Sequence, residues 1–191
     1  MKVQSPFPAN YEVGIPPELP SDGRDVLYFP PRESGQQHLY EAALKFAYPG
    51  QKPWHGVFAA RSKREEGLTM ASTLPDPNSC CISVLGTGYV LNVQRPSDWT
   101  SLQLYPVRQS VAIGDSGLLV LSCFTRITAY GREGRKWTTE RLCSDQLSIV
   151  GIKGRWIDCS GWDASSGQEV FFGVDISSGK LGRAGPALRS L

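Results

Sequence analysis

"FTRITAYGREGRKWTTERL", residues 124–142, is the stretch that decides the fold. Thr, Ile and aromatic residues dominate both of its halves, and a charged turn at Gly131–Gly134 separates them. β-Branched and aromatic side chains favour the pleated surface of a strand, and glycine favours tight turns. We therefore predict that this stretch forms two antiparallel strands of one sheet.

A second stretch repeats this arrangement. "CSGWDASSGQEVFFGVDISSGKL", residues 159–181, again runs from a strand through an aromatic residue and a polar turn into another strand. Trp162 and Gly167 take the places of Tyr130 and Gly134, and the two aromatic residues lie 32 positions apart. Repeats on this scale indicate stacked supersecondary units.

The repeat resembles a known family. "WDASSGQEVF" resembles the A-x-D-x-x-T-G-x-x-x-W hairpin of PQQ-type β-propeller repeats, with Ser166 at the Thr position and Phe171 or Phe172 near the Trp position. "AYGREGRKW" resembles a version with Gly131 in place of the Asp. The resemblance covers about residues 115–181 and implies blade-like antiparallel sheets. Known PQQ propellers hold their quinone with residues of a closed ring, so we expect no cofactor here.

Turn residues follow one another at short intervals from residue 54 onward, which is typical of an all-β protein. Propeller repeats use roughly 40 residues per blade, and closed rings need about four to eight blades. The β-rich part of the chain therefore supplies at most three or four small sheets. We predict a mainly β fold of blade-like antiparallel sheets, forming an open sandwich or an incomplete β-propeller.

The N-terminal third is expected to differ from the rest. Residues 1–33 are rich in proline, which fixes φ and removes backbone donors, so we predict an extended arm with a short edge strand at residues 25–29. Residues 34–191 are predicted as a single mainly β domain. Ser34 and Gln37 have the spacing of a capping box, and the apolar residues that follow recur at helical spacing. Together they predict one short α-helix at about residues 36–47.

Composition excludes several classes of function. The net charge of +2 is too small to indicate nucleic acid or a membrane surface as a partner, and no apolar stretch approaches the roughly 18 residues that a membrane span needs. The N-terminus lacks the apolar core of a secretory signal, and the five cysteines have no disulfide-type spacing. We therefore expect a cytoplasmic protein with reduced, mostly buried thiols.

Motifs that suggest catalysis have simpler explanations. "GDSG" at residues 114–117 resembles the nucleophile motif of trypsin-like proteases, but Leu118 and Leu119 replace the Gly-Pro that continues that motif, and we interpret it as a turn. Cys80 and Cys81 point to opposite faces of a strand, so they do not form a metal site together, and one thiol is expected in the core and the other near the surface. No metal site is predicted.

Aromatic and basic residues supply the candidate surface for a partner or ligand. Trp156, Asp158 and Trp162 have the same parity along their strand, so they share a face. Tyr130, Arg132, Arg135 and Trp137 interleave aromatic with basic side chains, although nearby glutamates offset the charge, so nucleic acid is not expected.

These observations favour a non-catalytic module that binds a protein partner. A small bacterial toxin-neutralising (immunity) protein is a specific case that fits the size and charge. A ligand- or carbohydrate-binding β domain that uses exposed Trp faces, and a hydrolase built from scattered residues around His38 or His55, stay open as alternatives. Bare sheet edges also predict a homodimer formed by edge pairing.

Overall fold

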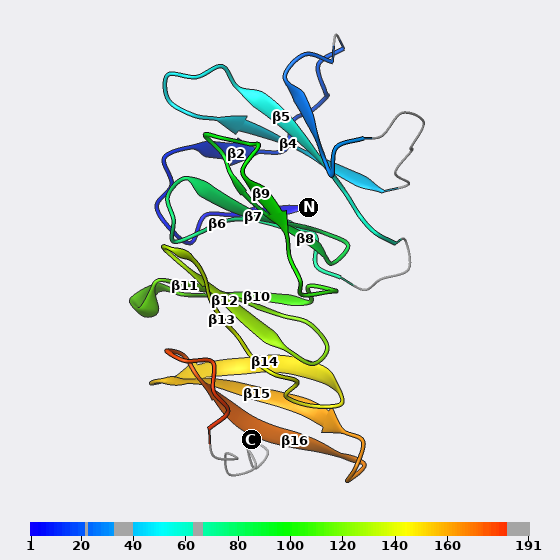
Figure 1. Cartoon of the computed structure of the whole chain (residues 1–191), viewed down its shortest axis with the longest axis vertical. Helices are drawn as coiled ribbons and strands as arrows, with labels where there is room; N and C mark the ends of the chain where they lie inside the picture. The colour runs from blue at the N-terminus through cyan, green and yellow to red at the C-terminus, as the bar shows by residue number, and fades with distance from the viewer. Residues whose placement is uncertain (22, 33–39, 63–66, 183–191) are drawn as a thin grey trace. The chain divides into compact units, whose positions relative to one another are not determined.

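The protein is built of β-strands in four open sheets, as the computed structural model in Figure 1 shows. The structure describes residues 1–21, 23–32, 40–62 and 67–182. The prediction of a mainly β fold is confirmed. The chain divides into two compact units, Met1–Val107 and Arg108–Leu191, each of which contains two of the sheets.

Sheet A of the first unit has five strands in the order β1-β6-β7-β8-β9. Their bounds are Lys2–Gln4 (β1), Met70–Thr73 (β6), Ser79–Val84 (β7), Thr87–Asn92 (β8) and Trp99–Ser101 (β9). β6 to β9 are antiparallel neighbours, whereas β1 adds to the edge parallel to β6.

Sheet B has four strands in the order β2-β4-β5-β3. Their bounds are Glu12–Gly14 (β2), Val26–Phe29 (β3), Glu41–Ala47 (β4) and Trp54–Ala59 (β5). β3 is the edge strand expected at residues 25–29, and it pairs parallel to β5. The proline-rich residues 1–33 thus contain three short strands that pair with both sheets of the unit.

The predicted helix at residues 36–47 is wrong where the structure describes it, because Glu41–Ala47 forms β4. Residues 36–39, like Ser34 and Gln37, lie outside the described residues. Leu44 and Phe46 are buried and the intervening Lys45 is exposed, which is the period-two pattern of a strand. Pairing with β2 on one side and β5 on the other therefore overrides the local helix propensity.

One apolar core joins the two sheets of the first unit. Phe46 of sheet B stacks on Trp54 at 4.4 Å between ring centroids, and Phe29 stacks on Phe58 at 4.8 Å. Phe58 then reaches sheet A, where its ring centroid lies 5.6 Å from that of Tyr89. Aromatic pairs at such distances add stabilisation beyond their burial, so this stack fixes how the two sheets pack.

Sheets C and D form the second unit. Sheet C has the order β10-β11-β12-β13 and sheet D the order β14-β15-β16, so each joins successive antiparallel strands. The bounds are Gln109–Ile113 (β10), Leu118–Ser122 (β11), Ile127–Gly131 (β12), Gly134–Thr138 (β13), Asp145–Lys153 (β14), Trp156–Asp163 (β15) and Gln168–Asp175 (β16). The hairpin predicted within residues 124–142 is confirmed as β12 and β13.

The core of the second unit lies between its two sheets. Ile127 and Trp137 of sheet C pack in one cluster with Ile157 and Phe172 of sheet D. The Trp137 indole N–H also donates a 2.9 Å hydrogen bond to the carbonyl of Ile176, which directly follows β16. The "GDSG" motif lies at the surface as a single 3₁₀ turn between β10 and β11, as expected.

Candidate functional site

The predicted aromatic and basic residues of the β12–β13 hairpin separate into two groups. Arg132 and Arg135 are exposed, whereas Tyr130 and Trp137 are both buried to 9% exposure. Trp137 also commits its indole N–H to the core, as described above. Only the two arginines of this group are therefore available to a partner.

Trp156, Asp158 and Trp162 alternate along β15, and their register with β16 places them on one face of sheet D. The Trp156 indole packs over Gly173 and Gly182, and the Arg155 guanidinium lies 5.3 Å from its ring centroid. Trp162 is 39% exposed and lies in register with Asp145 and Glu169. Of the two tryptophans, Trp162 thus presents the larger free face.

Two Asp-x-Ser-Ser-Gly turns follow each other in sheet D, at residues 163–167 and 175–179. Both aspartates accept hydrogen bonds from the backbone and hydroxyls of two serines, and in both turns the glycine N–H donates to the aspartate carbonyl. Gly167 and Gly179 have φ of +64° and +68°, which glycine adopts without a steric penalty. Sequence analysis identified the first of these two turns but not the second, which begins twelve residues later.

Asp175 has one partner that Asp163 lacks. The Arg155 guanidinium donates to the buried Asp175 carboxylate, with 2.7 Å between Nε and Oδ2. Hydrogen bonds from Ser177 and then Arg155 hold the pKa of Asp175 far below its ordinary value of 3.8. Ser165 and Ser166 lower the pKa of Asp163 as well. The first turn connects β15 to β16, the second follows β16, and hydrogen bonds within the turns occupy both carboxylates.

We expect Asp175→Asn to destabilise the protein at neutral pH more than Asp163→Asn does. A lowered pKa in the folded state contributes stability that is present above pH 3.8 and is lost as the pH falls towards the folded pKa. The difference between wild type and Asp175→Asn should therefore shrink between pH 7 and pH 3. Thermal unfolding at both pH values measures it, and a difference that is constant with pH would contradict the role of the ionised carboxylate.

The hydrolase alternative would need His55 or His38 beside a carboxylate or a thiol. Nδ1 of His55 is buried and has no hydrogen-bond partner among the described residues, and His38 lies outside them. Within the described residues, no three His, Cys, Asp or Glu side chains are grouped as a metal site would require.

The five cysteines are free and buried, in agreement with the expectation of reduced thiols. The more detailed expectation for Cys80 and Cys81 is wrong, because both are fully buried rather than one near the surface. Burial raises the pKa of Cys80 to about 12, that of Cys159 to about 12, and that of Cys81 above its usual range. Since the thiolate is the nucleophile, none of these three thiols is prepared for catalysis.

We expect Cys80, Cys81 and Cys159 to resist alkylation in the folded protein. Iodoacetamide at pH 8 should leave these three unmodified over a period in which the urea-unfolded chain reacts at all five cysteines. Mass spectrometry of peptides measures the modified sites. Rapid labelling of any of the three in the folded protein would show that its strand opens easily.

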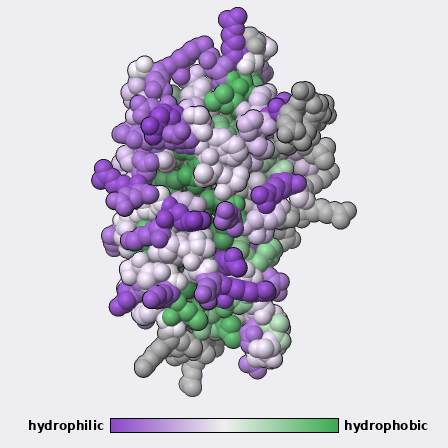
Figure 2. All heavy atoms as spheres, viewed as in Figure 1, coloured by the Kyte–Doolittle hydropathy of each residue, from purple (hydrophilic) through white to green (hydrophobic). Residues whose placement is uncertain are grey.

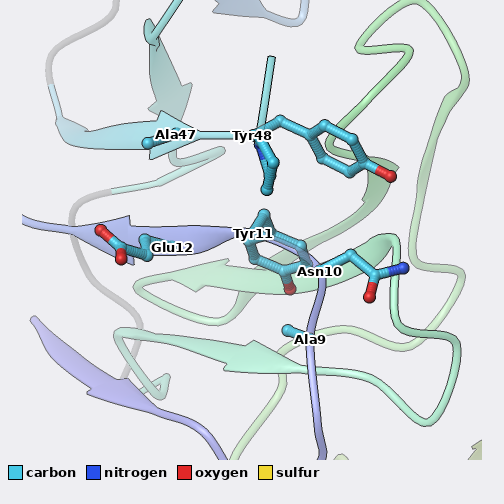
Figure 3. A pocket seen from close by; sticks show the side chains of 7 residues that line it. Ala9, Asn10, Tyr11, Glu12, Ala47 and Tyr48 are labelled. Atoms are coloured by element: carbon cyan, nitrogen blue, oxygen red, sulfur yellow. The ribbon is translucent and has the colours of Figure 1, made fainter. Parts of the chain in front are cut away.

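A groove in the first unit is lined by both polar and apolar groups. It has a volume of ≈ 430 Å³ and is lined by the segment Ala9–Glu12 and by Ala47, Tyr48 and Pro49. These two segments diverge where the pairing of β2 with β4 ends, at Glu12 and Ala47. Figure 3 shows the Tyr48 ring and the Asn10 amide on the same side of the groove, and Glu12 beside Ala47 at its other end.

A turn at residues 76–79 anchors both walls of this groove. The Asn10 amide and the Tyr48 hydroxyl donate to the same oxygen, Oδ1 of Asn78, at 3.0 and 3.1 Å. Tyr11 is buried, and its hydroxyl donates to the Ser79 carbonyl at 2.8 Å. Asp76 holds the turn itself through a 2.5 Å hydrogen bond from the Ser79 hydroxyl. The groove is therefore preformed, and sequence analysis did not find it.

On the face shown in Figure 2, apolar atoms form small separate areas among polar and charged side chains. No helix in the described part of the chain has the length and apolar character that crossing a bilayer requires.

Comparison with known proteins gives no family for the chain. No protein-family model matches it, and a search of curated proteins finds no relative. A functional proposal therefore depends on the surfaces and sites of the molecule itself.

Proposed function

We propose that the protein is a non-catalytic module that binds a protein partner through its N-terminal segment. One observation carries this proposal. Among the described residues of the first unit, every exposed large apolar side chain lies within the first 27 positions: Met1, Ile15, Leu19 and Leu27. Ile15 is 57% exposed and Leu19 40% exposed.

Two of these exposed residues, Ile15 and Leu19, belong to an anchored loop between β2 and β3. β2 pairs with β4 before the loop and β3 pairs with β5 after it, so both ends are fixed to sheet B. Pro16, Pro17 and Pro20 lie between these strands and restrict the backbone. Fixed ends and restricted prolines reduce the conformational entropy that is lost on binding, so burial of Ile15 and Leu19 contributes more to affinity. This combination favours a surface for a protein partner.

Within this class we propose a toxin-neutralising (immunity) protein of the bacterial cytoplasm. The length of 191 residues and the net charge of +2 agree with this role. Five free, buried thiols agree with a reducing compartment.

We also propose that the open sheets are blade-like, in the manner of PQQ-type repeats. Sheets C and D join successive strands in order, as the blades of a propeller do. The two Asp-x-Ser-Ser-Gly turns support the same comparison, since they occupy hairpin positions like that of the Asp-x-x-Thr-Gly turn.

The experiment compares three forms of the tagged protein in affinity purification from its native cells: wild type, Ile15→Ser/Leu19→Ser, and the control Val150→Ser. Val150 is 49% exposed but lies on β14 of the second unit. We expect a stoichiometric partner with wild type and control and its loss with the double variant, at unchanged circular dichroism. Equal capture by all three forms, or the absence of any stoichiometric partner, would refute the proposal.

The homodimer formed by edge pairing stays a prediction. β13 is an edge strand of sheet C, but it carries the exposed charges of Arg135 and Lys136, which oppose pairing there. β9 is an edge of sheet A without a charged residue, so we propose it as the pairing edge. Sedimentation at high concentration distinguishes a dimer from a monomer. Ser101→Pro in β9 removes an N–H that faces the open edge rather than β8, so it should abolish only the dimer.

A further inference from the structure

We propose that the groove between Ala9–Glu12 and Ala47–Pro49 binds a neutral oligosaccharide. Its volume of ≈ 430 Å³ lies within the range of small-ligand sites. None of the exposed apolar residues assigned above to the protein partner lines it. The inference therefore stands apart from the proposed partner surface.

The polar groups of the groove define the chemistry of its ligand. The Asn10 amide donates to Asn78, which leaves its carbonyl oxygen as an acceptor at the exposed rim. Glu12 is exposed and adds carboxylate oxygens, which only accept hydrogen bonds when ionised. A ligand that satisfies these acceptors must present several donors. The hydroxyl groups of a sugar meet this requirement without bringing a charge.

The apolar part of the groove suits the ring of a sugar. Tyr48 and Pro49 form one wall, and the small side chains of Ala9 and Ala47 leave the space open. Because the Tyr48 hydroxyl is fixed by Asn78, its ring keeps one orientation. An aromatic face held in this way packs against the C–H face of a pyranose, whose hydroxyls then reach Asn10, while the next ring of the ligand reaches Glu12 at the other end of the groove.

A second hollow favours an oligosaccharide over a single sugar. It has a volume of ≈ 750 Å³ and shares Ala9, Tyr11 and Glu12 with the first. Pro6, Phe7 and Pro8 add a further apolar lining on that side. Because the two hollows share residues of one segment, we infer that a ligand with several rings in a row extends from one into the other.

The test titrates maltotriose, cellotriose and triacetylchitotriose into the full-length protein, with calorimetry and backbone NMR as readouts. We expect one or more of the sugars to bind with a Kd below about 1 mM and to shift resonances of residues 9–12 and 47–49. Tyr48→Ala should weaken this binding at least about tenfold, and Glu12→Gln should weaken it less. Tyr48→Phe keeps the ring but loses its hydrogen bond to Asn78, so it should weaken binding less than Tyr48→Ala does.

Tyr28→Ala is the matched control, because Tyr28 is a partly exposed tyrosine of the same unit on β3. It should leave sugar binding unchanged. The proposal is overturned if none of the three sugars binds below that limit, or if Tyr48→Ala binds as wild type does. Binding of arginine methyl ester in place of the sugars would overturn it too, and would assign the acceptors to a cationic ligand. Affinity purification with the Ile15→Ser/Leu19→Ser variant tests the protein partner, whereas the sugar titrations test the groove. Either proposal can therefore fail without the other.

Discussion

Gly67→Ala is expected to destabilise the first unit by about 3 kcal/mol. The added methyl group would collide with backbone atoms, which cannot move aside as a flexible side chain can. A methyl group at Gly67 would lie closer than 3.0 Å to backbone atoms of Leu85 and Gly86. Three chain segments meet at this point, where Leu68 N–H donates to the Val107 carbonyl and Gly86 N–H to the Leu68 carbonyl. The turn between β7 and β8 must move to admit the methyl group, and these hydrogen bonds lengthen or break.

Hydrogen exchange measured by mass spectrometry checks this expectation. Peptides that cover residues 67–107 should exchange faster in Gly67→Ala, and the urea midpoint of the first unit should fall. Gly14→Ala is the control, because nothing lies within 4 Å of a methyl group at that position. It should change stability by less than about 1 kcal/mol. Equal stability of both variants would mean that the segment around Gly67 shifts at no cost.

The hairpins could be predicted from the sequence because they depend on neighbouring residues. β12 and β13 are connected by a short charged turn, and β15 and β16 by the Asp163 turn, so local alternation and turn chemistry were enough. The tandem turn at Asp175 could have been found in the same way, since "DASSG" and "DISSG" stand in the printed sequence.

β4 shows where local reasoning fails. "EAALK" consists of good helix formers, and its apolar residues fit a helical face as well as a strand face. The decision comes from the neighbours on both sides: Glu12 pairs with Ala47, and Trp54 pairs with Phe46. Neither contact can be read from the spacing of apolar residues within the segment.

The groove depends on contacts that are still more distant in sequence. Phe7 N–H donates to Thr73 Oγ1 across 66 positions, and the Asn10 amide donates to Asn78 across 68 positions. Prolines at positions 6 and 8 predicted only an extended segment. Tertiary pairing alone makes this segment run from the edge of sheet A to the edge of sheet B. The hollows lined by its residues follow from the same pairing.

Gln109→Met is expected to destabilise the second unit by about 2–4 kcal/mol, because it leaves buried polar groups without partners. The Gln109 side chain, on β10 of sheet C, pairs with the backbone of Ile149 on β14 of sheet D as another strand would. Its Oε1 accepts a 2.7 Å hydrogen bond from Ile149 N–H, and its Nε2 donates to the Ile149 carbonyl at 3.4 Å. The fully buried Ser122 hydroxyl donates to the same Oε1 at 3.2 Å.

Methionine has a similar length and an apolar end, so the variant preserves packing and removes only the hydrogen bonds. Gln109→Glu keeps acceptor oxygens at the end of the side chain and removes the amide N–H donor. Its carboxylate still accepts from Ile149 N–H and Ser122 but cannot donate to the Ile149 carbonyl, so an intermediate loss is expected. Urea unfolding, monitored by hydrogen exchange in peptides of residues 108–182, measures the stability of the three proteins. We expect wild type to be the most stable, Gln109→Glu to be intermediate and Gln109→Met to be the least stable. If Gln109→Met matched wild type, burial of the apolar core between Ile127, Trp137 and Ile157 would hold sheets C and D together without this polar link.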